Sequence, residues 1–174
     1  MNARSLARAS LYAAAYAGLT LAPGLNAVAY GPVQFRASEV LMVFACFDPA
    51  AVVGLTLGTA IANVASPIAV LDVPFGAALT LVAALVMWRI GPRWPALLAP
   101  VLVNGFGVAF ELALLADVPF WYGVAFVSLG EAVVLFSGGA ALLAVLRRHG
   151  GRLGLPACTP PLAARGGDEA RRTG

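Results

Sequence analysis

Two glutamates, Glu111 and Glu131, lie inside long apolar stretches of the chain. An ionisable group in such surroundings costs at least ~2.5 kcal/mol on membrane-insertion scales, and it is a functional candidate by default. Neither stretch contains a lysine or arginine that could neutralise these carboxylates. Asn104 precedes Glu111 by one heptad and therefore falls on nearly the same helix face. Because a carboxylate can accept two adjacent N–H donors, the pattern predicts a polar ligand-binding site.

Other polar residues interrupt apolar segments, and each has a structural alternative. Arg36 and Glu39 are three residues apart, so they could form an ion pair within one helix instead of binding a ligand. Asn63 and Asn104 could simply connect neighbouring helices by hydrogen bonds. Asp72 could equally be a helix cap. The residue types alone leave these alternatives open.

An aromatic pair opens the last apolar stretch. Trp121 lies on one helical stripe with Ser128 and Glu131, and Tyr122 follows it. The Trp121 ring could stack on a flat ligand beside a polar pocket. Both residues could instead belong to the aromatic belt at a membrane surface.

Catalysis finds no support in the sequence. The only histidine, His149, follows the last apolar stretch, so no Ser–His or metal-ligating arrangement is available within the stretches. Cys46 and Cys158 have no metal-ligand spacing and imply no disulfide. No glycine-rich phosphate loop offers a site for ATP. We therefore expect a protein that is not an enzyme and holds no metal or cofactor.

Composition identifies the solvent around these residues. Apolar residues make up 61% of the 174 residues, charged residues make up 11%, and the mean hydropathy is +0.89. A soluble domain carries roughly a quarter charged residues, so most of this chain must face a lipid bilayer. The net charge is +3, and every basic residue is an arginine, most of them beside an apolar segment. That distribution is typical of cytoplasmic membrane flanks and argues against a nucleic-acid partner.

Six apolar segments predict an all-α, polytopic membrane protein with six transmembrane helices. Residues 37–66 decide this number, because one helix of that length would measure ~45 Å against a hydrocarbon core of about 30 Å. A chain reversal at Asp48-Pro49 removes the mismatch, since Asp48 can cap the following helix and Pro49 suits its first turn. The expected helices are 5–22, 37–47, 49–66, 73–88, 96–116 and 120–146.

Six spans place both termini in the cytoplasm of a multi-pass protein of the cell membrane. Ten of the eleven arginines then become cytoplasmic, with only Arg36 outside, and the polar candidates gather in the outer half of the bundle. Residues 1–149 would form the transmembrane domain and 150–174 a disordered cytoplasmic tail. A competing interpretation is a signal peptide with a cleavage site at Ala27-Val-Ala29, which would leave five spans.

The first helix carries a stripe of small residues. Ala9, Ala13 and Ala17 repeat at four-residue spacing, with Ala14 and Gly18 beside them. Such stripes allow another helix to approach closely in a membrane. The stripe could meet a partner protein, or it could pack within the bundle.

Several motifs in series give the chain a resemblance to a known family. In order, they are GPVQFRASEVL at 31–41, FDP at 47–49, GLTLG at 54–58 leading to Ala62-Asn63, LDVPFG at 71–76, PVLVN at 100–104, EL at 111–112, PFW at 119–121 and GE at 130–131. Together they resemble the QueT family of queuosine-precursor transporters, which are substrate-binding (S) components of energy-coupling factor transporters. The resemblance covers about residues 5–148.

The resemblance implies a six-helix S component that binds a queuosine precursor, a 7-deazaguanine base, from outside. It also implies partners, namely a transmembrane coupling subunit and two cytoplasmic ATPases. The alanine stripe at Ala9, Ala13 and Ala17 is similar to the motif by which S components meet the coupling subunit. Alternatives are an S component or small permease for another vitamin or purine, and a membrane interaction protein that transports nothing.

The chemistry of such a base fits the polar residues. Its guanine-like edge presents adjacent N–H donors to a carboxylate, its carbonyl group needs a donor, and its ring needs an aromatic face. An aminomethyl form would be cationic and would use a second carboxylate. The expected substrate-binding residues are Gln34, Arg36, Glu39, Asn63, Asp72, Asn104, Glu111, Trp121 and Glu131.

Overall fold

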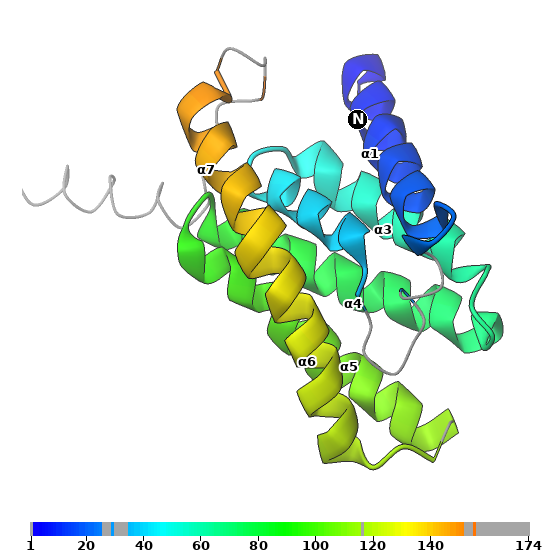
Figure 1. The fold of residues 1–174 in the computed structure, drawn as a ribbon. Coiled ribbons are helices and arrows are strands. Elements are labelled where there is room, and N and C mark those ends of the chain that lie inside the picture. Colours follow the sequence, from blue (N-terminus) through cyan, green and yellow to red (C-terminus); the bar gives the residue numbers. More distant parts are fainter. Residues whose placement is uncertain (1, 26–28, 30–34, 116, 152–154, 156–174) are drawn as a thin grey trace, which may run out of the picture.

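The computed structural model describes residues 2–25, 29, 35–115, 117–151 and 155. Across these residues all regular secondary structure is helical and no strand is present, as the sequence predicts (Figure 1). Gln34 lies outside the described residues, as does most of the predicted tail. The elements are α1 (Ala3–Leu21), η1 (Ala37–Cys46), α3 (Pro49–Asn63), α4 (Ala69–Ile90), η2 (Trp94–Leu97), α5 (Leu98–Leu115), α6 (Phe120–Val134), η3 (Leu135–Gly139) and α7 (Ala140–His149).

The predicted chain reversal between the second and third apolar segments is confirmed. The side chain of Asp48 accepts a 2.9 Å hydrogen bond from the backbone N–H of Ala50, and Pro49 occupies the first turn of α3. The preceding segment, η1, is a ten-residue 3₁₀ helix, which is longer than most helices of this type. The reversal therefore separates two short apolar helices, as the membrane thickness requires.

Within the part of the chain that the structure describes, three helices are long and apolar enough to cross a membrane. They run over Ala69–Ile90, Trp94–Leu115 and Phe120–His149. Two further apolar helices, Ala37–Cys46 and Pro49–Asn63, are shorter. Together with α1 they form the six helical segments that the sequence predicts. The protein is thus an all-α membrane protein in which six helical segments pack into one bundle.

The longest helical segment contains a π-helical turn. The elements α6, η3 and α7 form one continuous rod, drawn yellow to orange in Figure 1. Its π turn contains Gly138 and Gly139, which lie against η1: a Cβ added to Gly138 would be 2.9 Å from the side chain of Val40. A π turn widens a helix locally, and it is found often at functional sites. Here it lets the rod pass close to the 3₁₀ helix that carries Glu39.

The alanine stripe of α1 lies inside the bundle. Ala9, Ala13 and Ala17 are all buried, and α3 places glycines against this face. A Cβ added to Gly58 would lie 2.9 Å from the carbonyl oxygen of Ala13, and one added to Gly54 would meet the backbone of Ala9. Small residues on both helices thus allow their backbones to touch. These contacts correspond to the alternative in which the alanine stripe packs against another helix of the same bundle.

The apolar core occupies the end of the bundle where η1 ends and α3 begins. Its fully buried side chains come from α1, η1, α3, α4, η2 and α7, and include Tyr16, Met42, Leu55, Met87, Leu97 and Leu143. This arrangement leaves the polar candidates together in another part of the interior.

Candidate ligand-binding site

Seven of the nine expected binding residues are buried together. Each has at most 8% of its surface exposed, although they come from five different helical segments or their flanks. Water-free burial of so many polar side chains is costly unless they find partners. The buried polar cluster consists of Arg36, Glu39, Asn63, Asp72, Asn104, Glu111 and Glu131.

Glu39 is held by a tyrosine of the first helix. The hydroxyl of Tyr16 donates a short hydrogen bond to Oε1 of Glu39, and both side chains are buried. Next to them, the hydroxyl groups of Thr20 and Ser38 share a 2.6 Å hydrogen bond. The second oxygen of Glu39, Oε2, has no hydrogen-bond partner. The sequence does not single out Tyr16 as a site residue, because a tyrosine in an apolar helix carries no distinctive signal.

Asn104 and Glu131 join α5 to α6. Nδ2 of Asn104 donates a 2.8 Å hydrogen bond to Oε1 of Glu131. Gly105 allows the two helices to meet here, because an added Cβ would strike the hydroxyl of Ser128. Oε2 of Glu131 is buried and accepts no hydrogen bond. Asn104 therefore bridges helices, which was one of its alternatives, and also positions a carboxylate that still has acceptor capacity.

Asn63 connects the end of α3 to the first turn of α4. Its Nδ2 donates a 2.8 Å hydrogen bond to the backbone carbonyl of Asp72, while its Oδ1 is buried without a partner. Asp72 is not a helix cap, because α4 already begins at Ala69. Its side chain is buried beside Gly76, which also contacts the amide of Asn63.

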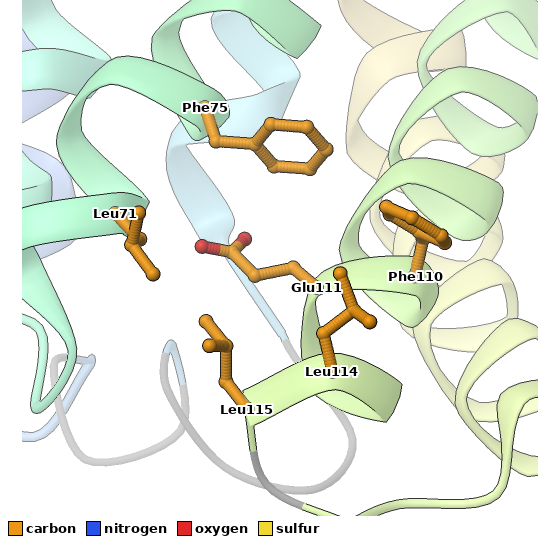
Figure 2. A pocket seen from close by; sticks show the side chains of 6 residues that line it. All are labelled: Leu71, Phe75, Phe110, Glu111, Leu114 and Leu115. Carbon is orange, nitrogen blue, oxygen red and sulfur yellow. The ribbon is translucent and has the colours of Figure 1, made fainter.

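Glu111 lines a pocket between α4 and α5 (Figure 2). Glu111 is 5% exposed, and neither of its carboxylate oxygens has a hydrogen-bond partner. The carboxyl group of Asp72 is close enough to interact with it. The pocket has a volume of about 120 Å³ and is lined by Leu71, Phe75, Phe110, Glu111, Leu114 and Leu115.

A larger pocket adjoins the pocket at Glu111. It has a volume of about 420 Å³ and is formed mainly by residues 66–71, which connect α3 to α4. Leu71 and Leu115 line both pockets, so the two lie next to each other at these side chains.

Arg36 is buried among the carboxylates, which corrects the expectation that nothing basic neutralises Glu111 and Glu131. It is 7% exposed, and its Nε donates a 3.4 Å hydrogen bond to the carbonyl of Ala29. Its positive charge acts on Glu39, Glu111 and Glu131. The sequence places Arg36 just before its helix, but it does not show that Glu111 and Glu131, which follow much later in the chain, lie within reach of its charge.

Trp121 lies apart from the buried polar cluster. It is 72% exposed and makes an edge-to-face contact with Phe120, with ring centroids 5.1 Å apart. Tyr122 is also exposed and packs against Phe126. These contacts fit the membrane-belt alternative. Phe75 and Phe110 instead place aromatic rings in the pocket that Glu111 lines (Figure 2).

The unpaired atoms of the cluster are all of one chemical kind. Five buried oxygens have no hydrogen-bond partner: Oε2 of Glu39, Oδ1 of Asn63, both carboxylate oxygens of Glu111, and Oε2 of Glu131. Each is an acceptor, at least while the carboxylates are ionised. A buried acceptor without a partner costs about 1–3 kcal/mol. A ligand that brings several N–H donors would remove that cost.

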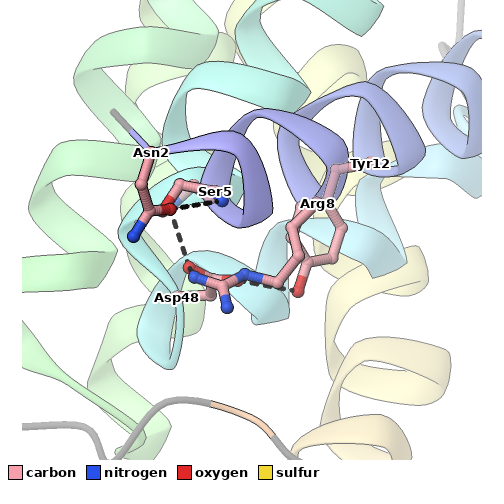
Figure 3. Close-up of polar contacts among 6 residues, drawn as sticks. Asn2, Ser5, Arg8, Tyr12 and Asp48 are labelled. Atoms are coloured by element: carbon pink, nitrogen blue, oxygen red, sulfur yellow. Dashed lines mark hydrogen bonds and ion pairs between the residues drawn. The ribbon is translucent and has the colours of Figure 1, made fainter.

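A second polar cluster ties the start of α1 to the η1–α3 reversal (Figure 3). Nε of Arg8 forms a 2.8 Å ion pair with Oδ2 of Asp48, and the hydroxyl of Tyr12 donates to the same oxygen at 3.3 Å. Asn2 caps α1 by accepting a hydrogen bond from the backbone N–H of Ser5. Asp48 therefore has all its partners within the protein, unlike the carboxylates of the buried polar cluster.

The described residues contain no group of three or more His, Cys, Asp or Glu side chains arranged to hold a metal ion. Apolar membrane-spanning helices that enclose buried acceptors without partners are typical of a membrane protein that binds a polar small molecule. The sequence profile of the QueT transporter family matches residues 6–148, and the chain belongs to this family. Membership of this family makes the chain a transporter and not an enzyme.

A curated relative supports the same assignment. The chain is 33% identical over 143 residues to the queuosine precursor transporter QueT of Lactococcus lactis subsp. cremoris (strain MG1363). The match covers 74% of this chain and 84% of the relative. No solved structure matches the chain.

Proposed function

We propose that the chain is the substrate-binding subunit for uptake of a queuosine precursor, a 7-deazaguanine base. The observation that supports this most strongly is the set of five buried acceptor oxygens without partners. The guanine-like edge of such a base presents adjacent N–H donors, which complement acceptors of this kind. The name of the similar Lactococcus lactis protein points to the same substrate.

Within this proposal, the two ends of the base have different partners. Glu131 is held by Asn104 and keeps one oxygen for a ligand, so it is suited to the N–H edge. Glu39 has one oxygen left in the same way and interacts electrostatically with Glu131. Arg36 offers guanidinium donors near the ring carbonyl. Phe75 and Phe110 provide apolar faces for the flat ring.

The test is calorimetry on the purified protein in lipid nanodiscs, without ATP. The panel contains 7-deazaguanines, guanine and common vitamins. We expect a 7-deazaguanine to bind most tightly, and Glu131→Gln to weaken that binding by about tenfold or more, because a charge-assisted hydrogen bond is lost. Leu129→Ala, on the exposed face of the same helix, is the matched control. Folded protein that binds no deazapurine would contradict the proposal, and binding of a vitamin instead would favour the alternative substrate.

We also propose that uptake requires a transmembrane coupling subunit and two ATPases, as in energy-coupling factor transporters. The family resemblance supports this partnership. A partner that used Ala9, Ala13 and Ala17 would have to displace α3, which covers them. The exposed face of α1 carries other small residues, Ala7, Ala14 and Gly18, and nothing lies within 4 Å of a Cβ added to Gly18. This second face is the better candidate for a helix of the coupling subunit.

Co-purification tests the coupling proposal. The chain is expressed with a coupling module from its own genome, and the retained ATPases are measured. Ala14→Trp should abolish retention while leaving binding of the deazaguanine intact. Leu57→Trp, on the exposed face of α3, is the control and should change neither. Retention that is unaffected by Ala14→Trp would exclude this face as the contact surface.

A further inference from the structure

We propose that one end of the bundle carries a docking surface for the headgroups of anionic phospholipids. The surface is made of exposed arginines from both halves of the chain, and it lies away from the buried polar cluster. The inference therefore does not depend on which substrate the protein binds. The basic rim, as we call this surface, consists of Arg4, Arg89, Arg93, Arg147 and Arg148.

The basic rim lies at the end of the bundle that holds the apolar core. It combines the first turn of α1, the last turn of α4, the residue before η2 and the last turn of α7. Three of these four places lie beside residues of one buried core, namely Met87, Leu97 and Leu146. The start of α1 is tied to the same end by the ion pair of Arg8 with Asp48. Figure 1 shows the start of α1 and the end of α7 on the same side of the bundle.

The basic rim has no counter-charge within the part of the chain that the structure describes. None of its five guanidinium groups forms an ion pair or a hydrogen bond with a described residue. The described carboxylate at this end, Asp48, is fully buried and already paired with Arg8. Asp117 follows the opposite end of α5, and the other described carboxylates are buried. The exposed positive charge therefore remains open to a partner outside the chain.

Helix electrostatics accounts for only part of the basic rim. Arg89, Arg147 and Arg148 lie in the last turns of α4 and α7, where the helix dipole stabilises a positive charge. Arg4 lies in the first turn of α1, where the same dipole disfavours a cation, and no acidic residue accompanies it there. Arg93 precedes η2 but its side chain makes no capping hydrogen bond. Neither Arg4 nor Arg93 therefore stabilises a described helix, which is expected if their charge serves an external ligand.

The apolar surface next to the basic rim identifies a lipid as that ligand. Within one helical turn of rim arginines, Leu6, Val86 and Val145 each have 38% or more of their surface exposed. In a membrane protein such side chains face the acyl chains, so the arginines beside them lie where the headgroups begin. Trp94, which is half exposed beside Arg93, is typical of that interface. A soluble acidic protein would meet only the polar part of this surface, whereas a phospholipid would meet both parts.

The chemistry of the guanidinium group favours phosphate. Every basic residue of the chain is an arginine, and arginine can bind phosphate oxygens through two parallel N–H donors. Zwitterionic headgroups also contain a phosphate, but their ammonium group offsets its charge. Each basic side chain near a membrane surface adds to the attraction for anionic lipid. The basic rim should therefore select phosphatidylglycerol over phosphatidylcholine.

Tryptophan quenching by brominated lipids tests this selection in the whole chain, reconstituted in vesicles without substrate or partner proteins. The vesicles contain phosphatidylcholine and phosphatidylglycerol, and only one of the two lipids is brominated in each sample. Trp88→Phe with Trp121→Phe leaves Trp94 as the single tryptophan, beside the basic rim. Trp88→Phe with Trp94→Phe leaves Trp121, at the start of α6, as the matched control. We expect phosphatidylglycerol to be enriched about fivefold around Trp94 but not around Trp121, and high salt to remove most of the enrichment.

Charge variants assign the enrichment to the basic rim. Arg89→Gln with Arg93→Gln should abolish most of the enrichment around Trp94. Arg89→Lys with Arg93→Lys should retain part of it, because the charge remains while the two parallel donors are lost. Arg171→Gln with Arg172→Gln removes the same net charge from the tail and should change nothing. Thermal unfolding shows whether each variant is folded.

Several outcomes would overturn the lipid-docking proposal. One is equal quenching of Trp94 by both lipids, and another is equal enrichment around Trp94 and Trp121. If the tail variant lowers the enrichment as much as Arg89→Gln with Arg93→Gln does, net charge rather than the basic rim is responsible. If the rim variant loses a coupling module while the quenching is unchanged, the arginines serve a protein partner instead. None of these outcomes bears on substrate binding, so the proposed function stands or falls separately.

Discussion

Asn104 on α5 and Glu131 on α6 are joined by a 2.8 Å hydrogen bond inside the buried polar cluster. The amide therefore links two helices and orients a buried carboxylate at the same time. The carboxylate retains Oε2 for a ligand. The interhelical and ligand-binding interpretations of Asn104 are therefore compatible.

Asn104→Leu should lower both stability and ligand affinity. The change leaves Glu131 buried without its donor, which costs about 1–3 kcal/mol of unfolding free energy. The measurement is thermal unfolding in detergent together with calorimetric titration. Leu102→Ala, on the exposed face of α5, is the control. Unchanged stability of Asn104→Leu would show that the hydrogen bond contributes little in the membrane protein.

Tyr16→Phe should destabilise the protein through Glu39. Removal of the hydroxyl leaves a fully buried carboxylate without its donor, so the expected loss is about 1–3 kcal/mol. The double variant Tyr16→Phe with Glu39→Gln should recover part of the loss, because the uncharged amide costs less to bury. The four proteins of this double-mutant cycle are compared by unfolding. Additive losses would mean that the two side chains do not act together.

Asp48→Ala should cost more stability than Arg8→Ala. Asp48 is fully buried, caps α3 and pairs with Arg8, whereas the Arg8 side chain is 38% exposed and water can replace part of its role. We expect losses of about 2–4 and about 1 kcal/mol, respectively. Adding Arg8→Ala to Asp48→Ala should then have little further effect. A double variant much less stable than Asp48→Ala would contradict this coupling.

Glycine substitutions should separate the two faces of α1. Gly58→Val places a side chain against Ala13 and Tyr16, so α1 and α3 must move apart and the protein should lose several kcal/mol or fail to fold. Gly18→Val meets open space and should be tolerated. Folded yield and thermal unfolding in detergent measure the difference. Equal tolerance of both changes would contradict the close packing of the two helices.

Cysteine labelling should reveal the orientation of the chain. With both termini cytoplasmic, Cys158 in a Cys46→Ala background should resist a membrane-impermeant maleimide in intact cells and react after lysis. Asp117→Cys in a background without Cys46 and Cys158 should react in intact cells, because the same topology would place the α5–α6 connection outside. The opposite pattern would invert the proposed topology.

The sequence by itself determined the helices and most of the polar residues of the candidate site. Hydropathy and helix length are local properties, so the lipid solvent, the six helical segments and the reversal at Asp48-Pro49 could be predicted from the chain alone. The cost of placing an ionisable group in a membrane depends on the residue type and on the apolar segment around it, and both can be taken from the sequence. This cost therefore makes Glu111 and Glu131 candidates without any knowledge of their three-dimensional surroundings.

Only the tertiary structure decided which groups meet. Periodicity places a residue on a helix face but does not say which helix covers that face. The stripe at Ala13 therefore packs against Gly58, Trp121 is exposed apart from the cluster, and Tyr16 reaches Glu39 from the preceding helix. The burial of Arg36 among three glutamates depends on the same packing of segments far apart in the chain. That packing leaves the acceptors of Glu111 unpaired, and it is the physical basis for the proposed substrate.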